Sequence, residues 1–471
     1  MRVLLVMPPN WGVEMPPLGI SYIASALKQD GHEVKILDYN LKIWHQLHGV
    51  TSIAWAMNSF SAWVHEEQYE AQLRGLIKPK FEALLEDVRE FRPDVLGFSV
   101  FATSIFPVRD VIEHIRPHFP EMKIILGGPQ VRDEYAHHVV WDGLADAAVI
   151  GEGEGTVREI LRLWQNQEPI IRPVLGAAVA VPTPERVLVG KDRPALEMDE
   201  LPFPDFSEVP LETYLTKSLP FSMSRGCIKR CTFCSEAPFW KRYRTRSAKS
   251  IFRELKHAHD TLGIKNFLSH DSLMNGNFEV LEELADLIIA DGLKITWQGM
   301  CRLDKRMTPA LLEKLKFAGC STISYGLESG SQKIADLMKK GVKITDALQV
   351  IKDSHAAGIV VNVFIIVGFP RESWLDFMKT MVFLFRIRRK IFLANVSDTG
   401  VMKGAPMQLR QKQFGIVENS LFRGEWHDKY YLNTIYHRKF KLWLMRKYIN
   451  ALRIHENKLI QPVETLFELP A

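Results

Sequence analysis

Three cysteines within eight residues form the most specific chemical signal in the sequence. Cys227, Cys231 and Cys234 follow a CxxxCxxC spacing, and thiolates are the usual protein ligands of iron–sulfur clusters. A structural zinc site would need four ligands, and no fourth Cys or His stands at a convenient spacing from the triad. The triad therefore predicts a [4Fe-4S] cluster held at three irons, with the fourth iron open to a chelating substrate.

The segment around this triad, with Phe233 directly before the last cysteine, resembles the signature of the radical S-adenosylmethionine (SAM) superfamily. The resemblance implies that the open iron chelates SAM and that an injected electron cleaves it to a 5′-deoxyadenosyl radical, which abstracts hydrogen from a substrate. It also implies a low-potential reductant such as flavodoxin or ferredoxin. No catalytic residue beyond the cluster is assigned.

The same resemblance implies SAM contacts at the ends of later strands. Asp271, in Ser-His-Asp-Ser, is a candidate acceptor for the amino group, although a strand-end turn is the alternative interpretation. Glu328 and Ser329 belong to a GLESGS segment and are candidates for the ribose or the sulfonium. Gly368 opens a GxPxE turn whose backbone would receive adenine. Phe233 completes this predicted SAM site, and Glu372 in the turn has a helix cap as its alternative role.

The remaining two cysteines lie in Met300-Cys301-Arg302 and Gly319-Cys320-Ser321. They are predicted to be buried structural thiols, with a catalytic hydrogen donor as the alternative role. Arg302 lies at the end of the third strand that is predicted for the radical SAM domain. Its guanidinium could reach a carboxylate in the active site.

The N-terminal third resembles the cobalamin-binding domain that precedes the radical SAM domain in cobalamin-dependent radical SAM enzymes. The resemblance rests on glycine- and proline-rich segments, most of them at the ends of predicted strands, where open α/β sheets bind ligands. It implies tentative cobalamin contacts at Pro9, Gly19, Gly128, Gly151 and Glu152.

One departure concerns the cobalt ligand. A DxHxxG motif is absent after the first predicted strand, where the sequence reads Pro-Pro-Asn-Trp-Gly from residue 8. Either cobalt lacks a histidine from the protein or cobalamin binding has been lost. His32, His137 and His138 are interpreted as helix-end or surface histidines. No early GxGxxG follows the first strand, which disfavours a nicotinamide cofactor.

Alternating strand and helix patterns predict the elements that position these residues. Residues 1–165 predict a five-stranded, doubly wound, Rossmann-like domain. The proline-rich residues 166–215 predict a linker with one hairpin. Residues 216–400 predict six strand–helix units, a partial (β/α)6 barrel of the triosephosphate isomerase type, and residues 401–471 a small, mostly helical element. The predicted barrel strands include 221–224, 266–269 and 360–367, and Thr308-Pro309 predict the start of a helix over residues 310–317. The fold class is α/β.

Composition limits the partners. A net charge of +5 over 471 residues is too small for a dedicated nucleic-acid binder. Five cysteines without a disulfide pattern indicate a reducing compartment, the cytoplasm. No transmembrane segment is expected. A basic, aromatic helix is predicted from about Lys429 to Arg453. It could contact a membrane surface or an anionic substrate, but such a pattern is more commonly a solvated face backed by an aromatic core contact.

Together these features predict a cobalamin-dependent radical enzyme that methylates an unactivated carbon of a small-molecule or natural-product substrate. The alternatives are a radical rearrangement or cyclisation, and a non-catalytic cobalamin or iron–sulfur sensor. A tRNA methylthiotransferase is disfavoured because residues 1–226 contain no cysteine. The sequence does not identify the substrate or the oligomeric state.

Overall fold

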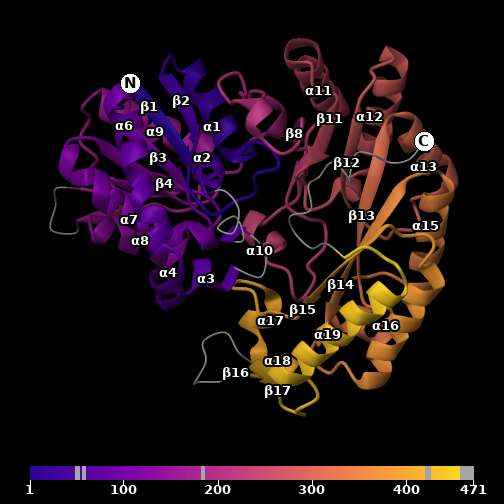
Figure 1. The fold of residues 1–471 in the computed structure, drawn as a ribbon. Coiled ribbons are helices and arrows are strands. Elements are labelled where there is room, and N and C mark those ends of the chain that lie inside the picture. The colour runs from indigo at the N-terminus through magenta and orange to yellow at the C-terminus, as the bar shows by residue number, and fades with distance from the viewer. Residues whose placement is uncertain (48–53, 56–59, 182–185, 419–425, 457–471) are drawn as a thin grey trace. The chain divides into compact units, whose positions relative to one another are not determined.

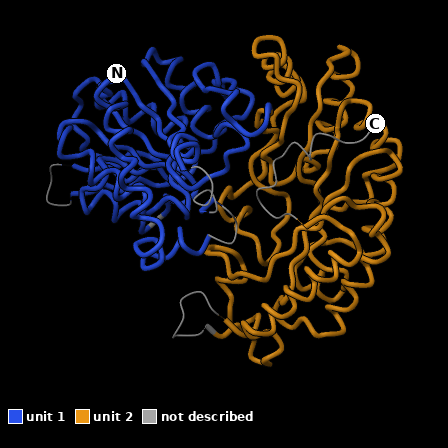
Figure 2. The backbone as a smooth tube through the Cα atoms, in the orientation of Figure 1, with its two compact units in different colours: residues 1–217, 459–471 blue, residues 218–458 orange. Residues whose placement is uncertain are grey.

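The computed structural model describes residues 1–47, 54–55, 60–181, 186–418 and 426–456. Contacts divide the chain into two compact units, Met1–Lys217 and Ser218–Lys458, which Figure 2 shows in blue and orange. Each unit is an α/β structure built around its own mostly or wholly parallel sheet (Figure 1), as predicted from the alternation of strands and helices.

The first unit is a sheet of seven strands in the order β2-β1-β3-β4-β5-β6-β7. The strands are β1 (Arg2–Met7), β2 (Glu33–Asp38), β3 (Val95–Ser99), β4 (Lys123–Gly127), β5 (Ala147–Val149), β6 (Ala177–Ala180) and β7 (Val187–Val189). The helices are α1 (Leu18–Gln29), α2 (Tyr39–Gln46), α3 (Phe60–Val64), α4 (Glu66–Gln72), α5 (Arg74–Ile77), α6 (Phe81–Phe91), α7 (Ile105–Ile115), α8 (Asp133–Trp141) and α9 (Gly153–Gln165).

The expected count of five strands was too low by two. β1 to β5 are parallel and lie where the apolar runs predicted them, but the hairpin β6–β7 from the predicted linker pairs antiparallel with β5 and extends the sheet. The linker's prolines flank these strands rather than interrupt them. A hairpin of small residues can therefore add to a sheet edge without showing a strong periodic pattern.

The second unit contains a six-stranded parallel sheet in the order β15-β14-β13-β12-β11-β8, the partial barrel that was predicted. Its strands are β8 (Ser218–Phe221), β11 (Asn266–Ser269), β12 (Thr296–Arg302), β13 (Cys320–Glu328), β14 (Val360–Val367) and β15 (Leu393–Asp398). Its helices are α10 (Glu236–Trp240), α11 (Ala248–Leu262), α12 (Phe278–Asp291), α13 (Pro309–Phe317), α14 (Gln332–Leu337), α15 (Ile344–Ala356) and α16 (Trp374–Ile387).

The first barrel strand begins earlier than its predicted start at Phe221. β8 contains Pro220, which lacks a backbone N–H, and a proline normally argues against a strand interior. Here the proline is tolerated because β8 is an edge strand that pairs only with β11.

The C-terminal part of this unit is less purely helical than predicted. It contains the short helices α17 (Pro406–Leu409) and α18 (Gln411–Phe414), a hairpin of β16 (Ile416–Glu418) and β17 (Trp426–Asp428), and the long helix α19 (Ile435–Ala451). The helix starts six residues after its predicted start at Lys429, because the Thr434 hydroxyl caps it by accepting from the His437 N–H at 3.3 Å.

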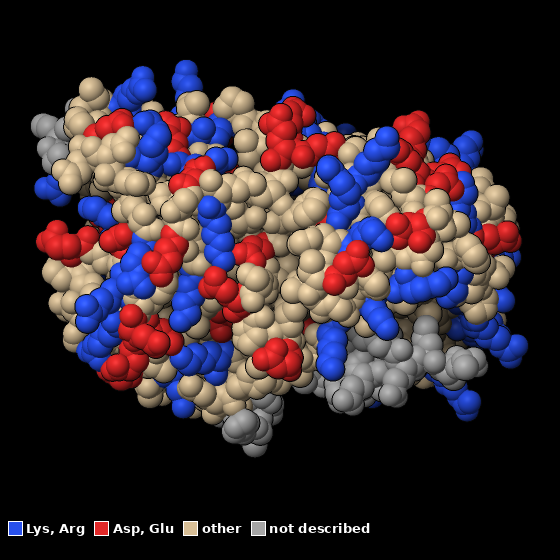
Figure 3. All heavy atoms as spheres, turned by 90° about the horizontal axis from the view of Figure 1, so that it is seen from above, with Lys and Arg blue, Asp and Glu red and all other residues tan. Residues whose placement is uncertain are grey.

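Charged side chains of both signs are interspersed on the face drawn in Figure 3, without a broad region of one sign. Among the described residues, no helix combines the length and apolar character that crossing a bilayer requires.

Candidate cluster and cofactor sites

The three cysteines of the triad lie on one loop at the carboxyl end of the first barrel strand. The loop runs between β9 (Ser224–Arg225) and α10, and β9 pairs antiparallel with β10 (Arg244–Thr245). Cys227, Cys231 and Cys234 are partly buried free thiols, whereas Cys301 on β12 and Cys320 on β13 are buried in the barrel. Burial of these last two agrees with their predicted structural role.

The triad thiols lie close enough to influence one another electrostatically. Burial, together with the charges of Glu236, Cys231 and Cys227, raises the pKa of Cys234 to about 11. Burial also raises the pKa of Cys231, against the opposing charge of Lys340. Among the described residues, no group of three or more His, Cys, Asp or Glu side chains already has metal-site geometry. Three thiols on one loop nevertheless fit a cluster that displaces their protons and leaves one iron open.

Asp271 secures the segment that leads into this loop. Its Oδ2 accepts from the Met223 N–H at 2.9 Å and the Ser269 hydroxyl at 2.5 Å, and its Oδ1 accepts from the Ser224 N–H and hydroxyl. Burial raises the pKa of this carboxyl, while the four donors favour its charged form. A carboxylate offers about four acceptor positions. The geometry thus favours a positioning role, and a contact with the SAM amino group would require one of these donors to leave.

Phe233 and Glu328 lie beside a lysine that the sequence analysis missed. Phe233 packs against a core that includes Met338 and Phe369, and the Lys340 Nζ lies 5.9 Å from its ring centroid. The same Nζ pairs with the Glu328 Oε1 at 3.1 Å. Lys340 lies in a Lys-rich stretch that resembles any solvated surface, so no sequence signal distinguished it.

Arg302 supplies a second cation near the triad. Its Nη2 donates to the Lys340 carbonyl at 2.6 Å. Burial lowers the pKa of Arg302, and the charges of Asp304, Cys231 and Cys227 oppose that decrease. Its Nη1 is buried and has no hydrogen-bond partner among the described residues. A buried, unpaired guanidinium nitrogen is costly, so this atom fits the predicted role of receiving a carboxylate.

Ser329 is occupied by the protein itself. Its side chain is fully buried, shares a hydrogen bond of 3.1 Å with the Thr380 hydroxyl on α16, and accepts from the Ser331 N–H. Ser331 in turn donates to Asp376 at 2.8 Å. The serines of the GLESGS segment therefore join the end of β13 to α16, and the predicted cofactor contact of Ser329 stays a prediction.

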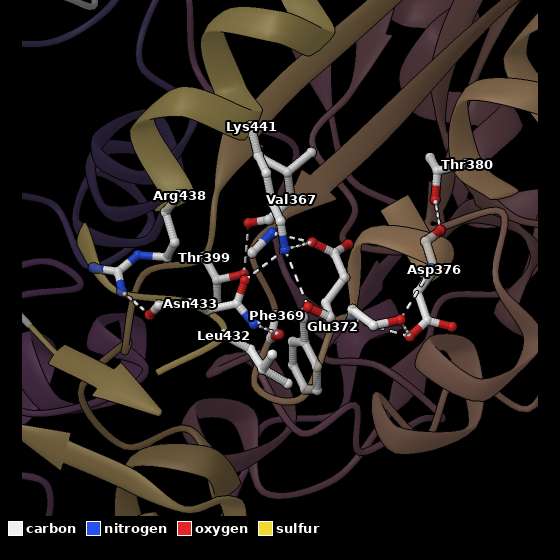
Figure 4. A network of polar contacts seen from close by, with 12 residues as sticks. Val367, Phe369, Glu372, Asp376, Thr380, Thr399, Leu432, Asn433, Arg438 and Lys441 are labelled. Carbon is white, nitrogen blue, oxygen red and sulfur yellow. Dashed lines mark hydrogen bonds and ion pairs between the residues drawn. The ribbon is translucent and has the colours of Figure 1, made fainter. Parts of the chain in front are cut away.

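The turn at Gly368 is covered by the C-terminal helix (Figure 4). Gly368 has φ +73°, and a Cβ built there would lie 2.5 Å from the Arg438 Cγ. Arg438 is itself buried, stacks over the Trp426 ring at 4.1 Å and donates to the Trp426 carbonyl. Glycine at position 368 is thus required by the fold, whether or not its backbone also receives adenine.

Glu372 and Lys441 form a buried ion pair next to this turn. The Lys441 Nζ donates to the Glu372 Oε2 at 3.0 Å and to the Asn433 Oδ1 at 2.7 Å, and Figure 4 shows it pointing from α19 into this network. The Gly368 N–H donates to the same Glu372 oxygen at 2.7 Å. Burial raises the pKa of Glu372 and Lys441 opposes that rise. Arg438 and Lys441 of the basic C-terminal helix are therefore internal, while its Phe440 and Trp443 are exposed, which corrects the expectation of a solvated basic face backed by an aromatic core contact.

In the first unit, the loop after β1 is organised by a buried asparagine that the sequence analysis missed. Asn40 accepts from the Trp11 N–H at 3.1 Å and donates to the Trp11 and Gly12 carbonyls. Trp11 stacks on Phe101 with ring centroids 4.0 Å apart. Pro9 is buried in this loop. An aromatic pair therefore stands at the carboxyl edge of β1 and β3, where a DxHxxG histidine would have followed the first strand.

The glycines predicted to contact cobalamin differ in the space that surrounds them. An added Cβ at Gly128 would lie 2.7 Å from the Val100 backbone, so the fold itself requires glycine there. At Gly19, in the first turn of α1, and at Gly151, after β5, an added Cβ would meet no atom within 4 Å. Glu152 follows Gly151 at the N-cap position of α9, where its side chain makes no capping hydrogen bond. Open space at the carboxyl edge of the sheet fits the approach of a large, flat ligand.

Of the three histidines named in the sequence analysis, one lies at the amino end of the sheet and two lie on α8. His32 precedes β2 and its Nδ1 lies 3.3 Å from the N-terminal amine of Met1, at the amino end of the sheet. His137 stacks on Trp141, with ring centroids 5.7 Å apart, within α8, and His138 is its neighbour on that helix.

We expect Gly19→Leu to reduce cobalamin retention without lowering the melting temperature, because the new side chain fills space that only a ligand would use. The measurement is the cobalamin absorbance per protein after reconstitution and desalting. Gly75→Leu on α5 is the matched control, since Gly75 is also an exposed helical glycine with open space around it. Equal retention by both variants would remove Gly19 from the proposed site.

Comparison with known proteins identifies the two units. Residues 221–384 match the Radical SAM superfamily, and residues 48–161 match the B12 binding domain. The chain therefore carries a radical SAM domain preceded by a B12-binding domain, the combination that the sequence resemblance indicated. These domains imply a [4Fe-4S] cluster, SAM and cobalamin as cofactors.

Curated relatives are moderately similar. The chain is 26% identical over 397 residues to an uncharacterized methyltransferase of Pyrococcus horikoshii, covering 81% of this chain and 77% of that protein. It is 27% identical to cytidylyl-2-hydroxyethylphosphonate methyltransferase of Streptomyces wedmorensis, covering 75% and 69%. It is 24% identical to the anaerobic magnesium-protoporphyrin IX monomethyl ester cyclase of Cereibacter sphaeroides, covering 79% of this chain and 58% of the cyclase.

Solved structures show the same fold. The cobalamin-dependent SAM radical enzyme OxsB superposes with a TM-score of 0.66 at 16% identity, covering 96% of this chain and 62% of that one. The radical SAM methyltransferase TsrM from Kitasatospora setae has a TM-score of 0.66 at 17% identity, covering 89% and 78%. This chain thus spans about three fifths of the length of OxsB.

Proposed function

We propose that the protein is a cobalamin-dependent radical SAM enzyme that methylates an unactivated carbon of a small-molecule substrate. The observation that carries the proposal is the combination of three neighbouring thiols at the carboxyl end of a partial barrel with a B12-binding unit in the same chain. When bound, the cluster and SAM supply a hydrogen-abstracting radical, and cobalamin supplies the methyl group.

The chain's own residues would bind and orient these groups. Cys227, Cys231 and Cys234 would hold the cluster, and Asp271 fixes the strand end from which their loop departs. Phe233, Glu328 and the turn at Gly368 would face SAM, and Arg302 would pair its free Nη1 with a carboxylate.

The cellular setting follows from the same chemistry. We propose a flavodoxin- or ferredoxin-type reductant and the cytoplasm as location, because five free thiols and a reducible cluster require a reducing compartment. No nucleic-acid partner is proposed, and the substrate is taken to be a small molecule or natural product.

Radical cyclisation is the second candidate, favoured by the similarity to the porphyrin-ring cyclase of Cereibacter sphaeroides. A non-catalytic sensor is the third. These candidates differ in what becomes of the SAM methyl group, because only methylation passes it to cobalamin and onward to a product.

The deciding experiment is anaerobic reconstitution with iron, sulfide and cobalamin, followed by reduction and addition of SAM carrying a deuterated methyl group. We expect mass spectrometry to find the labelled methyl on cobalamin, together with S-adenosylhomocysteine and 5′-deoxyadenosine. Formation of 5′-deoxyadenosine without labelled cobalamin would favour cyclisation. Absence of both products despite full cofactor loading would favour the sensor.

A further inference from the structure

The outward face of helix α16 carries large apolar side chains along its whole length. Trp374, Leu375, Met378, Val382 and Phe385 recur at helical spacing and are 42% to 64% exposed. The opposite face of the same helix, with Phe377 and Leu384 among others, is buried in the barrel. The sequence of α16 therefore supplies a second apolar face that the described structure does not cover.

Neighbouring barrel helices do not share this feature. The exposed positions of α12 are largely acidic, for example Glu282, Glu283 and Asp286, and α11 exposes Lys249 and Arg253. No large hydrophobic side chain of α12 or α15 is exposed, within the described residues. Ordinary solvation of a barrel helix thus does not explain α16.

The apolar face continues onto the C-terminal helix α19. Tyr436, Phe440 and Trp443 are 84%, 51% and 53% exposed. The rings of Trp374 and Phe440 are 6.0 Å apart, and those of Phe440 and Trp443 are 5.7 Å apart. The Tyr448 hydroxyl also donates to the Met381 carbonyl at 3.2 Å, which joins the two helices further along. We call these eight exposed side chains of α16 and α19 the apolar outer surface.

Basic side chains accompany this surface. From Trp374 to Lys390 the sequence has five basic residues against one acidic residue, Asp376, which is buried; from Lys429 to His455 it has no Asp or Glu. Lys439 and Arg446 pair with Asp398 and Glu456. Other exposed cations have no ion-pair partner in the part of the chain that the structure describes; they are Lys379, Arg386, Arg389 and Lys447.

We propose that the apolar outer surface docks the protein peripherally on an anionic membrane. Trp, Tyr, Phe and Leu side chains flanked by Lys and Arg suit the boundary between headgroups and acyl chains. Unpaired cations around the surface are attracted to anionic headgroups. A second copy of the chain fits less well, because an isologous contact would bring the same cations of both copies together.

Docking would also orient the enzyme. The apolar outer surface follows α16 from Trp374, next to the carboxyl end of β14, to Phe385 in the last turn of the helix. The side of the barrel formed by α16 and α19 would therefore lie against the lipid–water interface, with the Gly368 turn at one end of that side. This inference does not depend on the proposed methylation, since it concerns a surface and not the reaction.

The test is co-sedimentation of the full chain with vesicles of phosphatidylcholine alone and with phosphatidylglycerol added. We expect binding only to the anionic vesicles, weakened by high salt. Phe385→Glu combined with Phe440→Glu should weaken that binding about tenfold or more, since each exposed aromatic ring that would enter the lipid interface is replaced by a charge that anionic lipid repels. Arg386→Glu with Arg389→Glu should weaken it as well.

Phe317→Glu provides the matched control. Phe317 is 78% exposed on α13, outside the apolar outer surface, and its substitution should leave vesicle binding unchanged. Failure of the unaltered chain to bind anionic vesicles, or an equal loss in the Phe317 variant, would overturn the proposal. Light scattering that shows a dimer dissolved by the Phe385 and Phe440 changes, without vesicle binding, would assign the surface to a second copy instead.

Discussion

Replacing Cys231 by alanine is expected to reduce 5′-deoxyadenosine formation from SAM to background. The triad has no spare ligand, because Cys301 and Cys320 are buried in barrel strands and cannot reach the loop. With two thiolates left, the cluster loses a corner, and the open iron no longer has a defined position for SAM. The measurement is 5′-deoxyadenosine by liquid chromatography after anaerobic reconstitution and dithionite reduction, with iron and sulfide counted per chain.

Cys320→Ala is the control for this result. It also removes one thiol, but from a fully buried position on β13, so it should retain iron, sulfide and SAM cleavage. A Cys231→Ala protein that kept a full cluster and still cleaved SAM would show that the triad is not the ligand set.

The second large effect is expected for the buried ion pair behind the Gly368 turn. Lys441→Met should destabilise the barrel unit by about 3–5 kcal/mol, because it leaves the Glu372 carboxylate buried without its cation. Both side chains are almost fully inaccessible, at 0% and 1% exposure. Denaturant unfolding followed by circular dichroism measures the change in free energy.

Two further variants identify the cause. Lys439→Met removes a neighbouring lysine of the same helix that is 61% exposed, and it should change stability by about 0.5 kcal/mol or less. Adding Glu372→Gln to Lys441→Met should recover part of the loss, since no charge then remains buried. A Lys441 variant as stable as the Lys439 variant would contradict the conclusion that this ion pair stabilises the packing of α19 against the turn.

The glycine and membrane experiments concern different properties of the molecule. Gly19→Leu examines ligand space at the edge of the first sheet, and the Phe385 and Phe440 changes examine an external surface. All three positions are exposed, so we expect these substitutions to leave the protein folded. A loss of SAM cleavage by unfolding is therefore not expected in either set.

Local sequence was sufficient wherever neighbouring residues carry the information. The CxxxCxxC spacing confines three thiols to one loop through chain connectivity alone. Asn266–Ser269 and Val360–Val367 form strands with the predicted bounds. Helix α13 starts where Thr308 and Pro309 predicted, with the Thr308 hydroxyl accepting from the Leu311 N–H. Caps, turns and short apolar runs are local, so they can be read without the fold.

Tertiary structure decided what depends on residues far apart in the chain. The partnership of Glu372 with Lys441 spans 69 positions, and that of Glu328 with Lys340 requires the turn after β13. Pro220 became acceptable only because β8 lies at a sheet edge, and β6 and β7 became sheet strands only through β5. Hydrophobic periodicity likewise does not predict whether the second apolar face of α16 is buried. Burial depends on the elements that the fold packs against the helix, and not on the sequence of the helix itself.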